Sequence, residues 1–217
     1  MNREHLGDAY DFWKRAMLGI LRKPRRRIKI MPMVTDKKWT KPEIGTYRTL
    51  LGARTDELVL QNFDRKEGFP PQSPTGAKKW KKYNLFLDPD TGIENKKSKK
   101  SGKRREKSGT KSGEKSPKSV RYLKDYDLED LLGETNVVAV YQHAPREKEG
   151  WLRKKLNKLN GRRRNGIKAV GYEAGRVGMI FATRNEERSR EILEGLKKLA
   201  GPTAKGRVFP NRKKRPS

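Results

Sequence analysis

Short apolar runs with no polar alternation are the feature that most constrains the fold of this chain. They lie at 28–34, 83–87 and 137–141. Runs of this kind predict strands buried on both faces, and segments with helical periodicity alternate with them. We therefore expect an α/β fold, a Rossmann-like three-layer domain with a mainly parallel sheet. Residues 167–172 and 177–183, on either side of Gly175, predict a C-terminal antiparallel hairpin.

Capping signals predict where several helices begin. Asp8 is expected to cap a first helix that ends near Leu21, and Asn185 is expected to cap the last helix. Thr40 and Glu43 together predict the start of a second helix. Further helices are predicted at 122–132 and 145–159. The side chains expected to face the core are Phe12, Trp13, Ala16, Met17, Ile20 and Leu21 in the first helix, and Ile192, Leu193, Leu196 and Leu199 in the last.

Composition divides the chain into one folded domain and two basic segments. Residues 1–94 and 119–205 are expected to form a single α/β domain. Segment 95–118 holds 11 Lys or Arg against two Glu, a net charge of +9, and has no aromatic residue. Such a stretch buries too little apolar surface to offset its ordering entropy, so we expect a disordered insertion. Residues 206–217 are expected to be a basic flexible tail.

The net charge of +29 predicts a polyanionic partner, and DNA or RNA is the first candidate. Residues 1–10 carry acids and lack an apolar segment, and no apolar run approaches a membrane span, so we expect a cytoplasmic protein without membrane contact. There is no cysteine and there are only two histidines, which disfavours a zinc site. The residues expected to contact phosphates are Arg25, Arg26, Arg27, Arg153, Lys154, Lys155, Lys158, Arg162, Arg163 and Arg164.

Asp88 and Asp90 follow the run at 83–87 and are the first candidates for a reaction centre. Like charges at close range raise each other's pKa unless something neutralises them. A Mg²⁺ ion held by both carboxylates would do so and would support phosphodiester chemistry. A simple Asp-Pro-Asp turn, pairing with an arginine, and hydrogen bonding to a substrate are the alternatives.

The ends of three strands are expected to meet at the carboxyl edge of the sheet, at Thr35-Asp36, Asp88-Pro89-Asp90 and Gln142-His143. There His143 is a candidate general base or phosphate contact, and Arg146 a candidate for stabilising charge in the transition state. Asp8, Asp11 and Lys14 share one side of the first helix, which we interpret as a cap and a surface ion pair.

Four segments together follow the pattern GDxxDxxK, PMxT, DPDxG and YQHxPR, at 7–14, 32–35, 88–92 and 141–146. This pattern resembles an uncharacterised prokaryotic protein family, and the resemblance implies one domain without an assigned reaction.

Asp88-Pro89 is also similar to the start of the Asp-Pro-Pro-Tyr turn of Rossmann-type methyltransferases, which implies S-adenosylmethionine as a cofactor. Asp90 and Thr91 replace the second proline and the aromatic residue there. Asp88-Pro89-Asp90 is similar to the Asp-x-Asp turn of toprim domains as well.

Three functions follow as expectations. The first is a nucleic-acid-binding enzyme with metal-assisted, nuclease-type phosphodiester chemistry at Asp88 and Asp90. The second is a basic nucleic-acid-binding protein without catalysis on a degenerate enzyme fold. The third is a divergent methyltransferase that acts on nucleic acid with S-adenosylmethionine.

Overall fold

A computed structural model gives the fold of residues 6, 8–22, 27–33, 39–59, 79–89, 125–134, 136–144, 150–161, 166–202 and 207–210. The helices are α1 (Ala9–Leu21), α2 (Lys41–Leu50), α4 (Asp125–Leu131), α5 (Trp151–Asn160) and α6 (Glu186–Ala200). The strands are β1 (Ile28–Met33), β2 (Asn84–Pro89), β3 (Val137–His143), β4 (Lys168–Ala174), β5 (Val177–Thr183) and β6 (Val208–Phe209).

The strands form one open sheet in the order β1-β2-β3-β5-β4-β6. Strands β1, β2 and β3 are parallel to one another, whereas β5 is antiparallel to β3 and to β4, and β6 is antiparallel to β4. The α/β class is therefore confirmed. The expected parallel pairing holds for the N-terminal half of the sheet only.

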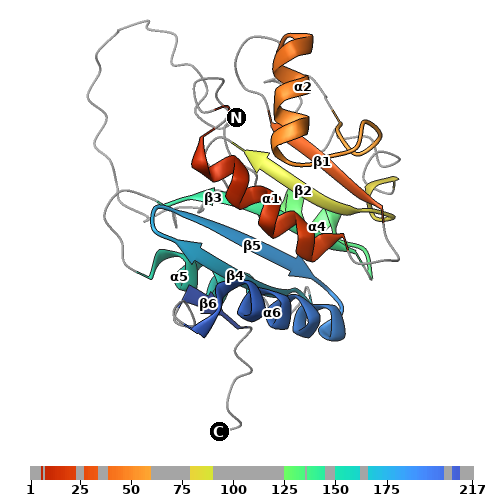
Figure 1. Ribbon diagram of the computed structural model, residues 1–217. Coiled ribbons are helices and arrows are strands. Elements are labelled where there is room, and N and C mark those ends of the chain that lie inside the picture. Colours follow the sequence, from red (N-terminus) through yellow and green to blue (C-terminus); the bar gives the residue numbers. More distant parts are fainter. Residues whose placement is uncertain are drawn as a thin grey trace, which may run out of the picture.

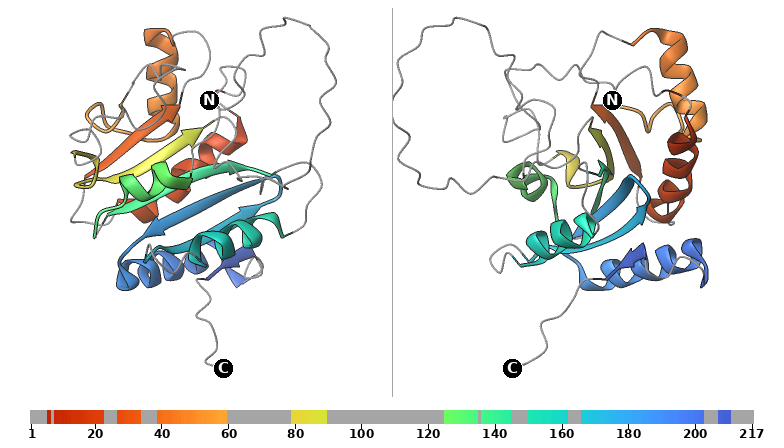
Figure 2. Two further views of the ribbon diagram at one scale, coloured as in Figure 1. Left: turned by 180° about the vertical axis from the view of Figure 1, so that it is seen from behind. Right: turned by 90° about the vertical axis from the view of Figure 1, so that its left-hand side faces the viewer.

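Helices cover both faces of this sheet (Figures 1 and 2). Helices α1, α2 and α6 pack on one face, and α4 and α5 pack on the other, each set against its own apolar cluster. Strands β2 and β5 are buried along their whole length, because side chains on both faces meet a helix layer. This explains why their sequences do not alternate between apolar and polar residues.

The predicted helix caps are confirmed. The Asp8 side chain accepts hydrogen bonds from the backbone N–H groups of Tyr10 and Asp11, and Asn185 accepts one from Arg188 N. At the start of α2, the Glu43 carboxylate accepts from both the backbone N–H and the hydroxyl of Thr40.

Three side chains expected in the core, Phe12, Ala16 and Leu199, are exposed instead. Phe12 is 58 % exposed and Leu199 is 45 % exposed. The buried face of α1 contains Met17, Leu18 and Leu21, and it continues toward the N-terminus through Lys14 and Asp11. The helix is therefore rotated relative to the predicted apolar stripe, and two charged side chains occupy its buried face.

At the C-terminal end of the fold, Val208 and Phe209 pair with β4 and are buried, although 206–217 was expected to be a tail. The segment expected to be disordered, 95–118, lies outside the described residues.

Candidate functional site

The carboxyl ends of the three parallel strands lie at one edge of the sheet. Met33 pairs with Pro89 across β1 and β2, and Leu87 pairs with Val140 across β2 and β3. Asp88 therefore lies at this edge, one residue beyond Leu87, as the sequence predicts. Of the other predicted turns, 34–38 lies outside the described residues, as does Asp90.

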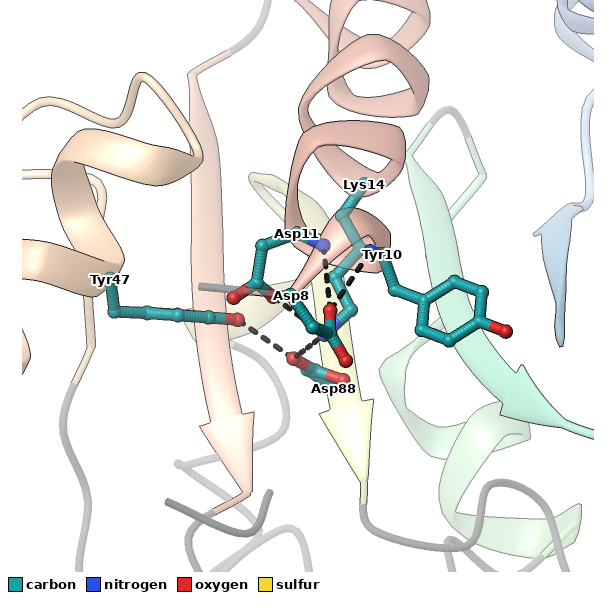
Figure 3. Close-up of polar contacts among 6 residues, drawn as sticks. All are labelled: Asp8, Tyr10, Asp11, Lys14, Tyr47 and Asp88. Carbon is teal, nitrogen blue, oxygen red and sulfur yellow. Dashed lines mark hydrogen bonds and ion pairs between the residues drawn. The ribbon is translucent and has the colours of Figure 1, made fainter. Parts of the chain in front are cut away.

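Asp88 is buried, with 2 % of its surface exposed, and its charge is neutralised by a lysine. Its Oδ2 accepts hydrogen bonds from Lys14 Nζ at 2.9 Å and from the Tyr47 hydroxyl at 2.9 Å (Figure 3). Helices α1 and α2 deliver these two donors from the same face of the sheet. No donor among the described residues bonds to the second oxygen, Oδ1.

Lys14 is shared between two buried carboxylates. Its Nζ lies 3.1 Å from Oδ1 of Asp11 and 2.9 Å from Oδ2 of Asp88, and 4.3 Å from the centre of the Tyr141 ring. Burial alone would lower the pKa of Lys14, but the charges of Asp88 and Asp11 outweigh it and raise this pKa above its ordinary value. The expected surface ion pair of α1 is thus wrong, because Asp11 and Lys14 are buried.

Two neutral phenols border the same carboxylate. Burial, and then the charge of Asp88 and its hydrogen bond, raise the pKa of Tyr47 well above its ordinary value. Burial, followed by the charges of Asp88 and Asp8, also raises the pKa of Tyr141. Both side chains therefore stay protonated at neutral pH. Trp39 packs edge-on against Tyr47, with ring centres 5.2 Å apart.

We call Asp8, Asp11, Lys14, Tyr47, Asp88 and Tyr141 the Asp88 cluster. Figure 3 shows the Asp8 carboxylate at the start of α1, which it caps, and its charge acts with that of Asp88 on Tyr141. The cluster holds three carboxylates and one ammonium group, so it is an acidic site in a strongly basic chain. The sequence pattern offered one signal for it, the three-residue spacing of Asp8, Asp11 and Lys14. No comparable pattern marks Tyr47.

His143 follows Tyr141 by two residues on β3, so the two side chains lie on the same face of the sheet at the same edge. The two rings meet edge-on, with centres 4.9 Å apart, and His143 is exposed. Gln142 lies between them and faces the opposite side, where its Oε1 accepts a hydrogen bond from Lys155 on α5. His143 and Gln142 therefore do not share a site. Arg146 lies outside the described residues.

The predicted phosphate contacts divide into three groups. Arg27, Arg153 and Lys154 are exposed, and Lys155 and Lys158 are half-buried. The Arg153 guanidinium lies over the Phe209 ring, 5.1 Å from its centre, so part of its side chain packs on β6. The remaining residues, Arg25, Arg26, Arg162, Arg163 and Arg164, lie outside the described residues.

No group of three His, Cys, Asp or Glu side chains within the described ranges is arranged to hold a metal ion. At Asp88, Oδ2 is already bound by an ammonium group, which would repel a second cation nearby. The predicted Mg²⁺ site at Asp88 and Asp90 stays a prediction, because Asp90 lies outside the described residues. In the same part of the chain, no helix is both long and apolar enough to cross a bilayer.

Comparisons with protein-family models, with curated proteins and with solved structures found no match for this chain.

Proposed function

We propose that this chain is a nucleic-acid-binding protein, built on a Rossmann-like three-layer domain with β4 and β5 as a C-terminal hairpin. The observation that carries the proposal is the exposed cationic face of α5 in a chain of net charge +29. Cations that neutralise phosphates release counterions, which favours binding whatever the base sequence.

Helix α5 is suited to this role because its two faces differ. Trp151, Leu152, Leu156 and Leu159 are buried against the sheet, whereas Arg153 and Lys154 are exposed. The apolar side fixes the helix on the domain and the opposite side presents cations to solvent. The helix begins beside the carboxyl edge, since the Trp151 ring lies against Gly178 near the start of β5.

A salt-titration experiment tests the proposal. Affinity for a labelled oligonucleotide is measured over a range of NaCl concentrations for the wild type and for Arg153→Gln/Lys154→Gln. Each lost phosphate contact should reduce the slope of log K against log[salt] by roughly 1, so the double variant should lose about 2.

Lys197→Gln/Lys198→Gln is the matched control, since it removes two adjacent exposed cations from α6. Equal slopes in the two double variants would argue against α5 as the contact surface. Failure of the wild type to bind either DNA or RNA in low salt would refute the proposed function as a whole.

Metal-assisted phosphodiester chemistry is a second candidate, and one observation favours it. Asp88 is fixed at the sheet edge by two donors to Oδ2, while Oδ1 receives no hydrogen bond from a described residue. Asp90, the other predicted ligand, follows two residues later in the sequence. Labelled DNA and RNA are incubated with Mg²⁺, Mn²⁺ or EDTA, with Asp88→Asn as the control. Cleavage that EDTA and the substitution both abolish is expected, and its absence would leave binding as the function.

A further inference from the structure

We propose that the Asp88 cluster receives the edge of an unpaired nucleobase, whose exocyclic amino group donates a hydrogen bond to Oδ1 of Asp88. The inference rests on the proposed nucleic-acid binding, and it assigns the base and the phosphates of one bound strand to different parts of the domain. The phosphates contact α5, and one base contacts the carboxyl edge.

The charge of the cluster selects against phosphate. Asp11 and Asp88 place two carboxylates around the Lys14 ammonium group, and Asp8 adds a third carboxylate at the start of α1. That ammonium group is already engaged by Asp11, by Asp88 and by the Tyr141 ring. A phosphate would meet repulsion that no unpaired cation of the cluster offsets, whereas a hydrogen-bond donor would meet acceptors.

Asp88 presents one acceptor in a fixed orientation. Lys14 and Tyr47 both bond to Oδ2, which prevents the carboxylate from turning, and no described residue donates to Oδ1. In Figure 3 the second carboxylate oxygen of Asp88 points away from Tyr47. Carboxylates accept hydrogen bonds from the exocyclic amino group of cytosine in known modes of base recognition.

Two exposed aromatic side chains lie on the elements that carry this cluster, α1 and β3. Tyr10 is 36 % exposed at the first turn of α1, and His143 is exposed with its ring against Tyr141. Figure 3 shows the Tyr10 ring extending from α1 on the side away from Tyr47. Bases stack on such rings with little sequence preference, and a base is available for stacking only when it is unpaired.

The test compares oligo(dC) with oligo(dT) of equal length at one salt concentration. The two strands carry the same phosphates, so counterion release contributes equally to the affinity for each. Only cytosine carries an exocyclic amino group. Wild-type protein should bind oligo(dC) about ten- to a hundredfold more tightly, the value of one hydrogen bond to a charged group. The preference should disappear with N4,N4-dimethylcytosine, which stacks but cannot donate.

Two variants locate the contact. Asp88→Asn should reduce the cytosine preference to near one, with a thermal melt to confirm folding. Tyr10→Ala should weaken binding of oligo(dC) and oligo(dT) by similar factors, and Tyr10→Phe should not, since stacking needs the ring alone.

The outcomes separate this inference from the proposed function. No binding of either strand would refute both. Salt-dependent binding with equal affinity for all three strands would overturn the base contact and leave the function standing. A cytosine preference that EDTA abolishes would also overturn it, because a metal ion rather than Asp88 would then contact the base.

Discussion

Substitution of Lys14 by Met should destabilise the fold more than any other single loss of a lysine charge among the described residues. Met keeps the length of the side chain and removes the ammonium group. Asp11 and Asp88 would then face each other as buried carboxylates, with 0 % and 2 % of their surfaces exposed and no cation between them. The contact with the Tyr141 ring would lose its charge as well.

The expected cost follows from the burial of the pair. Removal of one partner from a buried salt bridge costs about 3–5 kcal/mol, because the remaining charge stays desolvated. Typical domains unfold with about 5–15 kcal/mol, so this loss is a large part of the total. For a chain of this size, 1 kcal/mol shifts the midpoint of thermal unfolding by about 2–4 °C. Lys14→Met should therefore melt roughly 6–20 °C below the wild type.

The assay is thermal and urea unfolding at neutral pH, with Lys197→Met as the control. Lys197 also pairs with an acid three residues earlier, Glu194, but both side chains are largely exposed. An exposed pair contributes about 0–1 kcal/mol, so this control should melt near the wild type. Equal losses in the two variants would refute the argument that Lys14 neutralises a buried acidic site. Asp88→Asn added to Lys14→Met should recover part of the stability, since the carboxylate that lost its ammonium partner is then neutral.

Two further predictions concern alkaline pH and the joint between α1, β2 and β3. The pKa values of Tyr47 and Tyr141 are raised in the folded state, so at alkaline pH these phenols stay protonated in the fold and ionise on unfolding. The free energy of unfolding should therefore fall as the pH rises above about 10, the ordinary pKa of tyrosine. Tyr47→Phe should lessen this fall, as measured by urea unfolding at several pH values. Asn84 is fully buried, donates a hydrogen bond to a backbone carbonyl of α1 and accepts one from a backbone N–H of β3. Asn84→Ala should therefore lower the free energy of unfolding by about 2–4 kcal/mol. Asn157→Ala, on the exposed face of α5, is the control and should change it little in the same unfolding assay.

Local signals were sufficient for most of the secondary structure. The caps at Asp8 and Asn185 depend on side chains within three residues of the groups they bond, and a sequence shows such neighbours directly. Burial on both faces of β2 followed from its unbroken apolar run. Strand β6 has only two residues, Val208 and Phe209, and its pairing with β4 depends on contacts that no local pattern records.

The site was predicted only in part, because its interactions are not local. Asp88 was placed at the sheet edge from the end of an apolar strand, which is a local signal. Its partners are 74 and 41 residues away along the chain, at Lys14 and Tyr47, and only the fold brings them together. The buried face predicted for α1 was wrong for the same reason. A charged side chain is assigned to a buried face only when its partner is known, and the sequence does not show that partner.

The position of Lys14 also explains how Asp11 and Asp88 can be buried as ionised carboxylates close together. Two buried carboxylates close together need a positive charge between them, and a solvated surface cation cannot supply it from a distance, because salt and water screen the interaction. A lysine anchored on α1 supplies it at 3.1 Å and 2.9 Å and leaves one oxygen of Asp88 without a described donor. The acidic site is therefore stable without a ligand. Under the proposed function, a partner that contacts this site would gain selectivity there, while its affinity would come from the cationic face of α5.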